Sequence, residues 1–312
     1  MVFMITGTFL MVSKNEKNGE GNWFIYALLT ALFTSLATIL GKIGIKDINP
    51  NLGTMLRTII ILIIIGGVIF IKKEYKKAIR KEIASSSLGE KHKYLYSDLG
   101  FIMLGDLIEE LSGKSLDFYL QETFYTPMGL THTTYNPIAH NQNPDNIVPS
   151  IEAIDFRKTA LKGYVHDEAA ALNGGVSGHA GLFSNAKDLF AICQMLLNQG
   201  EYQGQRYLKA ETIKTFNKRY FEKHSNRRGL GFDKPLISSP SNHCSKYCSQ
   251  ESFGHSGFTG TYFWVDPQNN TIFIFLSNRV YPDAKTNKLA QMNIRTDIQD
   301  LIYESLKGES KK

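Results

Sequence analysis

Three short segments of this chain carry side chains that can transfer protons or attack an acyl carbon. They are Tyr96-Ser97-Asp98, His255-Ser256-Gly257 and Ser184-Asn185-Ala186-Lys187. Phenol, imidazole, hydroxyl and amine groups of these kinds serve as acids, bases and nucleophiles in acyl transfer. The pair His166-Asp167 and His179 add further titratable groups within a long polar segment. Whether these groups can act together depends on the elements that carry them.

A second kind of chemistry, metal binding, is suggested by His243, Cys244 and Cys248 in one polar segment. Structural zinc sites close a tetrahedron with two pairs of Cys or His ligands, and no second pair is near in the sequence. The sequence therefore predicts no metal and no cofactor, and a stray thiol pair is the simpler interpretation. Three cysteines without a paired framework say little about the redox compartment.

The residues around the first motif predict helices. From Asp98 to Leu111 the spacing puts an apolar face on a helix that stops at Gly113, and Ser115 is the expected cap of a second short helix ending before Pro127. That predicted face consists of Leu104, Leu107, Ile108 and Leu111. Residues 136–181 contain Pro, Asn and Gly clusters and predict a long loop, of a length that suggests function.

The second half of the chain predicts helix, then hairpin, then helix. A helix begins at Ser184, with Leu189, Cys193 and Leu196 on one face, and ends at Gly200. The runs 261–265 and 271–276 are aromatic and β-branched and predict a hairpin. A last helix is predicted to pack on that sheet through one apolar side, formed by Ile294, Ile298, Leu301, Ile302 and Leu306. Helices followed by an antiparallel sheet backed by a helix indicate an α+β fold.

The N-terminal residues predict two membrane spans, 23–41 and 52–71. The stretch from Trp23 to Leu40 has no charged residue, and the second run is interrupted only by Arg57 near its start. Both are long enough to cross a bilayer. The alternative is a pair of buried helices in a soluble core, which is disfavoured because residues 58–71 show no polar stripe. The lipid bilayer is therefore a predicted partner.

Charge is distributed unevenly along the 312 residues. Residues 1–84 carry 11 Lys and Arg against 5 Asp and Glu, so the whole net charge of +6 belongs to this part. A nucleic-acid partner is not predicted, because the remaining chain is neutral and offers no basic face. Six basic residues between Lys72 and Lys81 place that segment in the cytoplasm by the positive-inside rule. The expected location is a bacterial cytoplasmic membrane, with the folded part on the cytoplasmic side.

These patterns divide the chain into four parts. Residues 1–21 are a disordered lead-in, 22–81 a two-helix membrane segment, 82–93 a polar linker, and 94–312 a folded domain. Residues of about 22–75 resemble the opening helix pair of EamA-type drug/metabolite transporters, through Asn22 to Leu29, Leu40 to Ile45 and Asn51 to Thr58. Transporters need many more helices to enclose a substrate path, so the resemblance implies an anchor or a transporter fragment.

The folded domain carries three separated motifs in one order. They are Tyr94 to Phe101, Gly178 to Ser184 and Phe253 to Thr261. From about Tyr94 to Gly308 the chain resembles the β-lactamase-related serine hydrolases, in the class C-like esterase and penicillin-binding branch. The resemblance implies a partial β-lactamase/transpeptidase-like fold without its N-terminal part, and acyl ester or peptidoglycan-like substrates.

The resemblance also implies roles. Tyr96, with Asp98 in the same motif, would relay a proton to the leaving group, which needs a lowered pKa near cationic neighbours. His255 matches the lysine of the family's Lys-Thr-Gly strand, and a neutral imidazole there favours an esterase or peptidase. Gly257 would let substrate approach the strand edge, and the Phe258 N–H would supply half of an oxyanion hole.

The same resemblance places further residues at the rim of the site. They are Ser97, His166, Asp167, His179 and Ser256. For His166, Asp167 and His179 the alternative is that they only bond the backbone of their own loop.

The family's nucleophile, a Ser with a Lys three residues later, is missing before Tyr96. The one Ser-x-x-Lys in the chain is Ser184 with Lys187, which aligns with a segment where Ser starts a helix, so we interpret Ser184 as an N-cap and a decoy. Two function classes remain, a membrane-anchored acyl hydrolase with impaired catalysis and an inactive fusion or truncation product that only binds. Without the family's first strands, the hairpin is expected to leave an edge and part of its core uncovered.

Overall fold

The computed structural model describes residues 63, 67, 76–87, 89, 95–151, 160–221, 226–236, 243–282 and 284–309. The chain divides into two compact units, 1–79 and 80–312, and the description below concerns the second. The predicted spans 23–41 and 52–71 lie outside the described residues, apart from Ile63 and Gly67. Within the described ranges, no helix combines the length and apolar character needed to cross a membrane.

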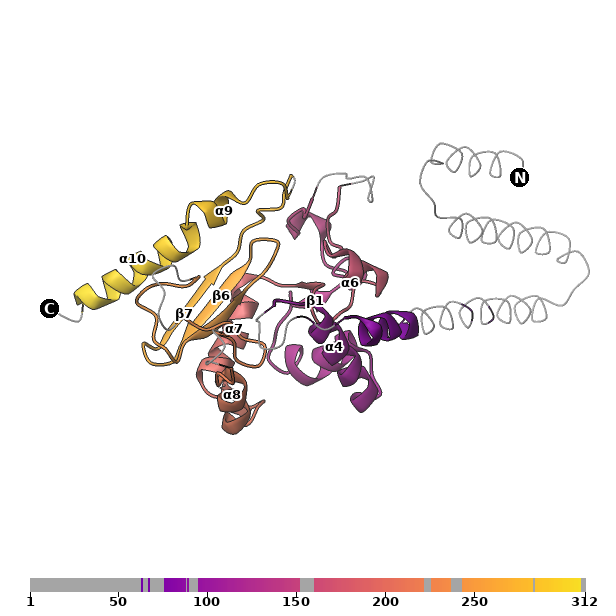
Figure 1. Cartoon of the computed structure of the whole chain (residues 1–312), viewed down its shortest axis with the longest axis horizontal. Helices are drawn as coiled ribbons and strands as arrows, with labels where there is room; N and C mark the ends of the chain where they lie inside the picture. The colour runs from indigo at the N-terminus through magenta and orange to yellow at the C-terminus, as the bar shows by residue number, and fades with distance from the viewer. Residues whose placement is uncertain are drawn as a thin grey trace, which may run out of the picture. The chain divides into compact units, whose positions relative to one another are not determined.

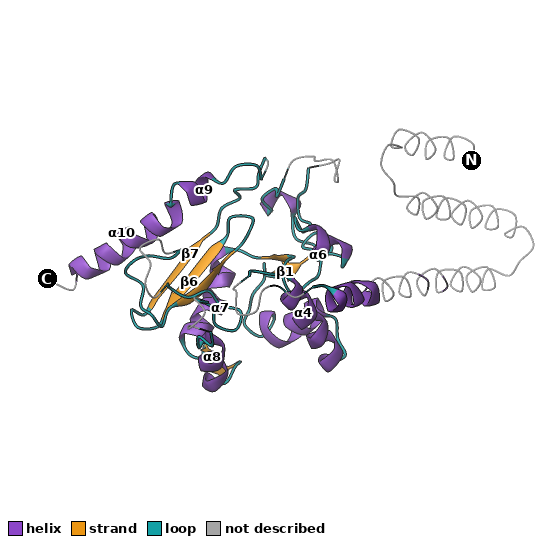
Figure 2. Ribbon diagram, in the orientation of Figure 1, coloured by secondary structure: helices purple, strands orange, loops and turns teal. Residues whose placement is uncertain are grey.

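The helices and strands are interleaved along the second unit (Figures 1 and 2). The helical elements are α4 (Leu99–Ser112), α5 (Leu116–Leu120), the π-helix η1 (Gln121–Tyr125), the 3-10 helix η2 (Pro144–Asn146), α6 (Glu168–Leu172), α7 (Ala186–Leu197), α8 (Ala210–Asn217), α9 (Lys288–Gln291) and α10 (Ile294–Glu309). The strands are β1 (Thr134–Tyr135), β2 (Leu182–Phe183), β3 (Glu201–Tyr202), β4 (Gln205–Arg206), β5 (Phe253–Ser256), β6 (Tyr262–Asp266) and β7 (Thr271–Phe275).

The main sheet is antiparallel, with strand order β5-β6-β7. The predicted hairpin is confirmed, since β6 pairs with β7 from Tyr262 opposite Phe275 to Asp266 opposite Thr271. Two short ribbons, β1-β2 and β3-β4, stand apart from it. Among the described residues β7 has a neighbouring strand on one side only. Helices lie along both faces of this sheet, which is the predicted α+β arrangement (Figure 1).

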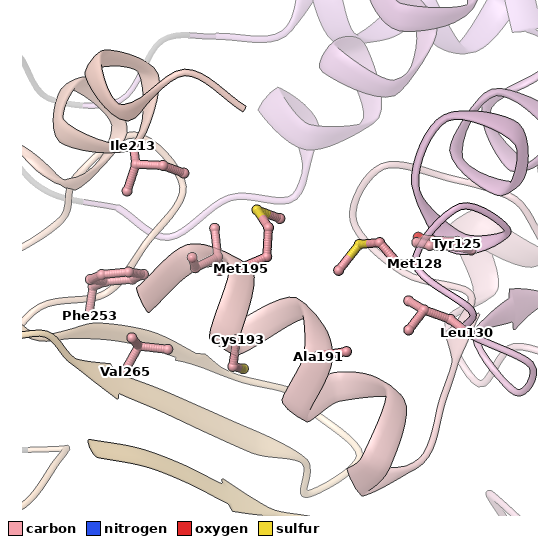
Figure 3. Close-up of a cluster of buried hydrophobic side chains, with 10 residues drawn as sticks. Tyr125, Met128, Leu130, Ala191, Cys193, Met195, Ile213, Phe253 and Val265 are labelled. Carbon is pink, nitrogen blue, oxygen red and sulfur yellow. The ribbon is translucent and has the colours of Figure 1, made fainter. Parts of the chain in front are cut away.

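One face of the sheet packs against α7. Because side chains alternate along a strand, Val265 of β6 and Phe253 of β5 point to this face, where they meet Cys193 and Leu196 of the helix. The cluster continues to Tyr125, Met128 and Leu130, which reach it from η1 and the following turn (Figure 3). The predicted helix face with Cys193 and Leu196 is therefore buried, and this cluster is the largest apolar core described.

The opposite face of the sheet is smaller and aromatic. Tyr262 and Trp264 of β6 stack with ring centroids 5.7 Å apart, and Phe273 of β7 meets Tyr262 edge-on at 5.8 Å. Cys244 covers them from the preceding segment. The Trp264 Nε1–H donates to Ser252 Oγ at 3.0 Å, so this buried indole is hydrogen-bonded.

The buried carboxylate of Asp266 joins three elements beside this aromatic face. It accepts hydrogen bonds from the Ser249 N–H at 2.9 Å, the Asn269 amide at 2.8 Å and the Tyr303 hydroxyl at 2.8 Å. Burial raises the pKa of Asp266, but these donors, led by Ser249, outweigh it and leave the pKa below its ordinary value of 3.8. The Asp266 carboxylate thus connects the end of β6 to the 243–252 segment and to α10.

The face that α10 turns toward the protein is polar, which contradicts the predicted apolar side. Gln299 is 1% exposed and accepts from the Ser245 N–H at 2.8 Å, while Tyr303 is 3% exposed. By contrast Leu301 is 63% exposed. The prediction was wrong for Ile298, Leu301, Ile302 and Leu306, which are all exposed. Periodicity locates an apolar side but not the neighbour that covers it, and here the buried neighbour is the polar 243–252 segment.

Helix α4 likewise buries a different side from the predicted one. It ends as predicted at Gly113, whose φ of 68° is the left-handed conformation that glycine accepts readily. Its buried residues are Ile102 and Gly105, because the backbone of Gly178 lies against this side: a Cβ at Gly105 would come within 2.9 Å of the Gly178 nitrogen. Of the predicted face, Leu104, Leu107 and Leu111 are exposed and Ile108 is half-buried. The following helix starts after Ser115 as predicted, although the Ser115 side chain makes no capping hydrogen bond.

The predicted loop over residues 136–181 contains little regular structure, and its ends are tied down. Residues 134–135 pair with 182–183 as β1 and β2, so the loop leaves and returns at one point. Asp188, buried near the start of α7, fixes this point by accepting from the His132 N–H at 2.8 Å and from Thr133 Oγ1 at 3.1 Å. The loop is therefore closed by a buried carboxylate rather than by a longer sheet.

Replacing Asp266 by Asn should lower the free energy of unfolding by about 2–4 kcal/mol, because the amide cannot accept all of these donors and leaves buried groups unpaired. The depressed pKa makes this contribution fully present above the unfolded pKa, near pH 4, and lost as the pH falls through the folded pKa. Urea denaturation of the full chain at pH 7 and at pH 3 measures both effects. The exposed Asp297 of α10 supplies the control, Asp297→Asn. Equal stability of the two variants would contradict the assignment.

Candidate active site

Two of the predicted site residues, Tyr96 and His255, lie side by side although they are far apart in the sequence. Tyr96 precedes α4 and His255 lies in β5, and their ring centroids are 6.2 Å apart. Arg228 joins them. Its guanidinium carbon lies 5.4 Å from the Tyr96 ring centroid, and its Nη2 is 2.7 Å from His255 Nε2. The cluster formed by Tyr96, Arg228 and His255 is the candidate active site.

Strand β5 positions His255 through an unusually close backbone approach. At Gly254 a Cβ would lie 2.1 Å from the Phe263 carbonyl oxygen, so only glycine fits between β5 and β6. On its other side Gly254 exchanges two backbone hydrogen bonds with Asp233, at 2.8 and 3.0 Å. This bridge brings the segment with Arg228 alongside the strand that carries His255.

Asp233 is buried and holds two arginines. Its Oδ1 lies 3.2 Å from Arg228 Nη1 and 3.3 Å from Arg227 Nη2. Sequence reasoning missed Arg228 and Asp233, because they belong to none of the motifs. The one available signal is the pair Arg227-Arg228 directly before Gly229-Leu230-Gly231, where two adjacent cations need a nearby anion.

The acidity of Tyr96 differs from the expectation. A proton relay needs a lowered pKa, yet partial burial, followed by the charge of Asp98 and a hydrogen bond to it, raises the pKa of Tyr96 above 10.0. Arg228 acts in the opposite direction but is outweighed. The phenol is therefore protonated at neutral pH. The expectation of a lowered pKa was wrong, because it counted on cationic neighbours, whereas burial and the charge of Asp98 outweigh Arg228.

The other residues of the first motif begin α4. Ser97 is exposed, and its Oγ accepts from the Leu99 N–H at 3.3 Å. Asp98 is the N-cap residue, and its carbonyl oxygen accepts from the N–H groups of Phe101 and Ile102, both at 3.0 Å. Ser97 is therefore used in starting the helix, while Asp98 both starts the helix and faces the Tyr96 phenol.

The second motif continues into a turn with an exposed aromatic residue. Phe258 is 63% exposed, lies under the Arg279 guanidinium at 4.4 Å and faces the His166 ring at 5.4 Å. Among the described residues no backbone carbonyl accepts from the Phe258 N–H, the predicted oxyanion donor. At Gly257 a Cβ would lie 2.2 Å from Thr261 Oγ1, so a larger residue here would have to displace the Thr261 side chain.

Two of the remaining rim candidates, Asp167 and His179, form a separate hydrogen-bonded chain with Ser177. His179 places Nε2 at 2.8 Å from Asp167 Oδ1 and Nδ1 at 2.9 Å from Ser177 Oγ. Asp167 also caps α6 by accepting from the Ala170 N–H at 2.8 Å. Although Ser, His and Asp occur together, Ser177 is 6% exposed and its hydroxyl is not accessible to an acyl substrate. This chain orders the loop that lies against α4. Of the rim candidates, His166 lies beside Phe258 and Ser256 directly follows His255 in β5.

Ser184 was predicted to be the N-cap of α7, but it lies one residue before the N-cap. The capping residue is Asn185, whose side chain accepts from the Asp188 N–H at 2.9 Å. Ser184 Oγ instead lies 2.8 Å from Thr133 Oγ1, and Lys187 is exposed on the helix. The serine hydroxyl is thus engaged with Thr133 beside β1.

The segment with His243, Cys244 and Cys248 packs against the aromatic face of the sheet. A hydrogen bond to Cys248, together with burial, raises the pKa of the Cys244 thiol well above its ordinary value of 9.0. Cys248 Sγ donates to the Tyr303 hydroxyl at 3.6 Å. Metals bind thiolates, and the raised pKa of Cys244 disfavours its thiolate. Among the described residues no group of three or more His, Cys, Asp or Glu is arranged to hold a metal ion.

Comparisons with known proteins match this part of the chain. A family model described as beta-lactamase matches residues 70–295. An Escherichia coli K12 protein named "Putative D-alanyl-D-alanine carboxypeptidase" is 34% identical over 235 residues, which cover 69% of this chain and 54% of that protein. A Salmonella gallinarum protein of the same name has the same identity and coverage. The chain thus spans about half the length of the curated relatives it matches.

Solved structures with a similar fold include a β-lactamase from Mycobacterium bovis. It is 20% identical, with a TM-score of 0.48, and the alignment covers 70% of this chain and 67% of that one. A penicillin-binding protein homologue from Caulobacter crescentus is 17% identical, with a TM-score of 0.47, and covers 67% of this chain and 59% of its own.

Ionisation of Tyr96 should occur above pH 10, since burial and Asp98 oppose the phenolate. The difference in ultraviolet absorbance between the wild-type chain and Tyr96→Phe isolates this one phenol during a pH titration. Asp98→Asn should move the transition to lower pH, because the opposing negative charge is removed. Appearance of the Tyr96 phenolate below pH 10 in the wild-type chain would instead support the proton-relay role.

Proposed function

The chain belongs to the β-lactamase family, and on that premise we propose that it presents the ligand-binding part of a penicillin-recognising serine hydrolase site. Its ligands are acylated peptides that end in a carboxylate, of the kind found in peptidoglycan. It binds these ligands without an activated nucleophile of its own, so that turnover is impaired.

The observation that supports this proposal best is the contact of Arg228 with both Tyr96 and His255. The guanidinium of Arg228 is permanently charged, so it places a fixed positive charge beside both rings. The exposed Tyr96 phenol adds a neutral hydroxyl next to this charge, and this hydroxyl would exchange its hydrogen bond to Asp98 for one to the ligand. An anionic peptide end would therefore find a cation and a neutral hydroxyl in one place.

The turn after β5 supplies the second half of the proposed contact. The Phe258 N–H, which no backbone carbonyl of the described residues accepts, would donate to the acyl carbonyl oxygen of the same ligand. The Phe258 ring, backed by Arg279, offers an exposed apolar surface for a side chain of the ligand. Because His255 and Phe258 are three residues apart, both contacts come from one short stretch of chain.

The nucleophile is the missing part. In this chain Ser-x-x-Lys occurs once, at Ser184, whose hydroxyl bonds Thr133, and the Ser177 hydroxyl is buried in the His179 chain. The family's oxyanion hole combines a strand N–H with the N–H of the nucleophile, and loss of one such donor costs about 3–4 kcal/mol. Losing the attacking group as well removes the covalent step itself.

Intact-mass analysis of the full chain, after exposure to a fluorophosphonate and separately to a labelled penicillin, tests the loss of the nucleophile. We expect no stoichiometric adduct on protein that remains folded. An adduct would contradict the proposal, and peptide mapping with Ser177→Ala and Ser184→Ala would then identify the activated serine.

Ligand binding is tested on the same protein by calorimetry with an acylated D-alanyl-D-alanine peptide and its C-terminal amide. We expect the amide to bind at least about 10-fold more weakly, since one charge-assisted hydrogen bond contributes about 1.5–3 kcal/mol. The ratio of the affinity for the acid to the affinity for the amide should fall toward one in the Arg228→Gln variant. Arg206→Gln, a change at an exposed arginine of β4, is the control. Equal affinity for acid and amide would refute recognition of the carboxylate.

We also propose that residues 23–41 and 52–71 anchor the chain in a bacterial cytoplasmic membrane, with residues 80–312 on the cytoplasmic side. Support comes from their apolar length, interrupted only by Arg57, and from the basic residues between Lys72 and Lys81. The anchor would hold the binding surface near the bilayer.

The anchor predicts that the full chain stays in the membrane fraction after carbonate extraction. Arginines in both spans, Leu28→Arg with Leu32→Arg and Leu62→Arg with Ile65→Arg, should release it, because each arginine costs about 2.5–3.5 kcal/mol at the centre of a span. Ser86→Arg, outside both spans, is the matched control. Protease added to sealed right-side-out vesicles should spare residues 80–312, and digestion there would reverse the proposed orientation.

A further inference from the structure

The hydrogen bonds around His255 determine which of its ring nitrogens carries a proton. Arg228 Nη2 lies 2.7 Å from His255 Nε2, and His255 Nδ1 lies 2.9 Å from the Ser256 carbonyl oxygen. A guanidinium nitrogen has only hydrogens to offer and a carbonyl oxygen has only lone pairs. Nε2 must therefore accept and Nδ1 must donate, which defines a neutral imidazole protonated at Nδ1.

A second proton on this ring would be opposed by geometry. It would sit on Nε2, directly facing the N–H of a guanidinium that does not deprotonate in proteins. Arg228 cannot easily move away, because the same Nη2 donates to the Gly231 carbonyl at 2.9 Å and Nη1 lies 3.2 Å from Asp233. Its side chain is 10% exposed, so water screens this contact poorly.

The charged and titratable groups around His255 come from three segments. Arg227, Arg228 and Asp233 belong to the segment bridged to β5, Tyr96 with Asp98 precedes α4, and His243 lies beyond Arg227, whose Nε is 3.3 Å from His243 Nε2. Burial, and after it the charge of Arg228, lowers the pKa of His255 below 6.5, although Asp233 acts in the opposite direction. The cluster thus favours an uncharged imidazole.

We propose that Arg228 is a positioning residue that fixes His255 as the neutral tautomer protonated at Nδ1 and occupies its Nε2 lone pair. His255 is then neither a proton donor nor a base toward a ligand. The positive charge at this end of β5 is carried by Arg228. This inference goes beyond the proposed function, because the tautomer is set by the protein whether or not a ligand binds.

Nitrogen NMR of the full chain, labelled with ¹⁵N-histidine, distinguishes the two tautomers and the imidazolium directly. His255→Asn identifies the signals of His255 by their loss. We expect the wild-type chain to show a protonated Nδ1 and an unprotonated Nε2 throughout pH 6–8. An Nε2-protonated ring, or an imidazolium that persists at pH 7, overturns the proposal with no variant needed.

Variants then assign the effect to Arg228. Arg228→Gln should raise the pKa of His255 above that of the wild-type chain, because burial remains but the opposing charge of Arg228 is lost while Asp233 stays. Arg228→Lys keeps a charged group with donors only and should restore the low pKa and the Nδ1 tautomer. The matched control is Arg227→Gln, which also removes a partner of Asp233 but touches His243 instead. It should leave the His255 tautomer unchanged.

Two outcomes of the variants would overturn the role of Arg228. One is an unchanged pKa and tautomer of His255 in folded Arg228→Gln. The other is an equal change in Arg227→Gln, which would indicate a general loss of structure. If Arg228→Gln does not fold, Arg228→Lys decides, since failure of the lysine variant to keep the Nδ1 tautomer contradicts the proposal.

Discussion

The backbone bridge between Asp233 and Gly254 is the constraint on which the candidate site depends. Two hydrogen bonds, at 2.8 and 3.0 Å, fix the Asp233 backbone against β5, and its buried carboxylate then fixes Arg227 and Arg228. A buried carboxylate without a counter-charge in this position would cost several kcal/mol, so the two ion pairs keep the arginines beside the strand. The approach is possible only because Gly254 has no side chain. Placement of Arg228 beside His255 thus follows from one glycine and one buried anion.

Buried carboxylates act in the same way elsewhere in the described fold. Asp266 ties the end of β6 to α10, and Asp188 ties the start of α7 to β1. Each receives several donors, which offsets the cost of removing its charge from water. Apolar packing is concentrated between the sheet and α7, whereas α4 and α10 expose much of their apolar surface. The loops around the site are therefore positioned by polar contacts with defined directions, and such contacts set geometry more narrowly than apolar packing does.

Local structure could be predicted from the sequence where the signal was itself local. Alternating aromatic and β-branched residues located the hairpin of β6 and β7, and Gly113 marked the end of α4. The buried faces of α4 and α10 could not be predicted, because helical periodicity identifies an apolar side without showing what lies against it. Arg228 was missed for a related reason. Its role depends on a contact with His255 across 27 residues of sequence, made through a bridge that leaves no motif. Ser184 was misplaced by one residue, since Asn185 caps a helix equally well.

The protonation states of the cluster are the reason for proposing recognition rather than proton transfer. Efficient acid–base catalysis needs a group whose pKa lies near the working pH, with an accessible proton or lone pair. Tyr96 keeps its proton because partial burial and the charge of Asp98 oppose the phenolate, and the His255 lone pair at Nε2 is directed at Arg228. The guanidinium keeps its charge under all physiological conditions. What remains is a fixed cation next to a neutral hydroxyl donor, an arrangement suited to holding an anionic group. A nucleophile added to this chain would therefore also need its own base, since neither Tyr96 nor His255 is poised to take the proton.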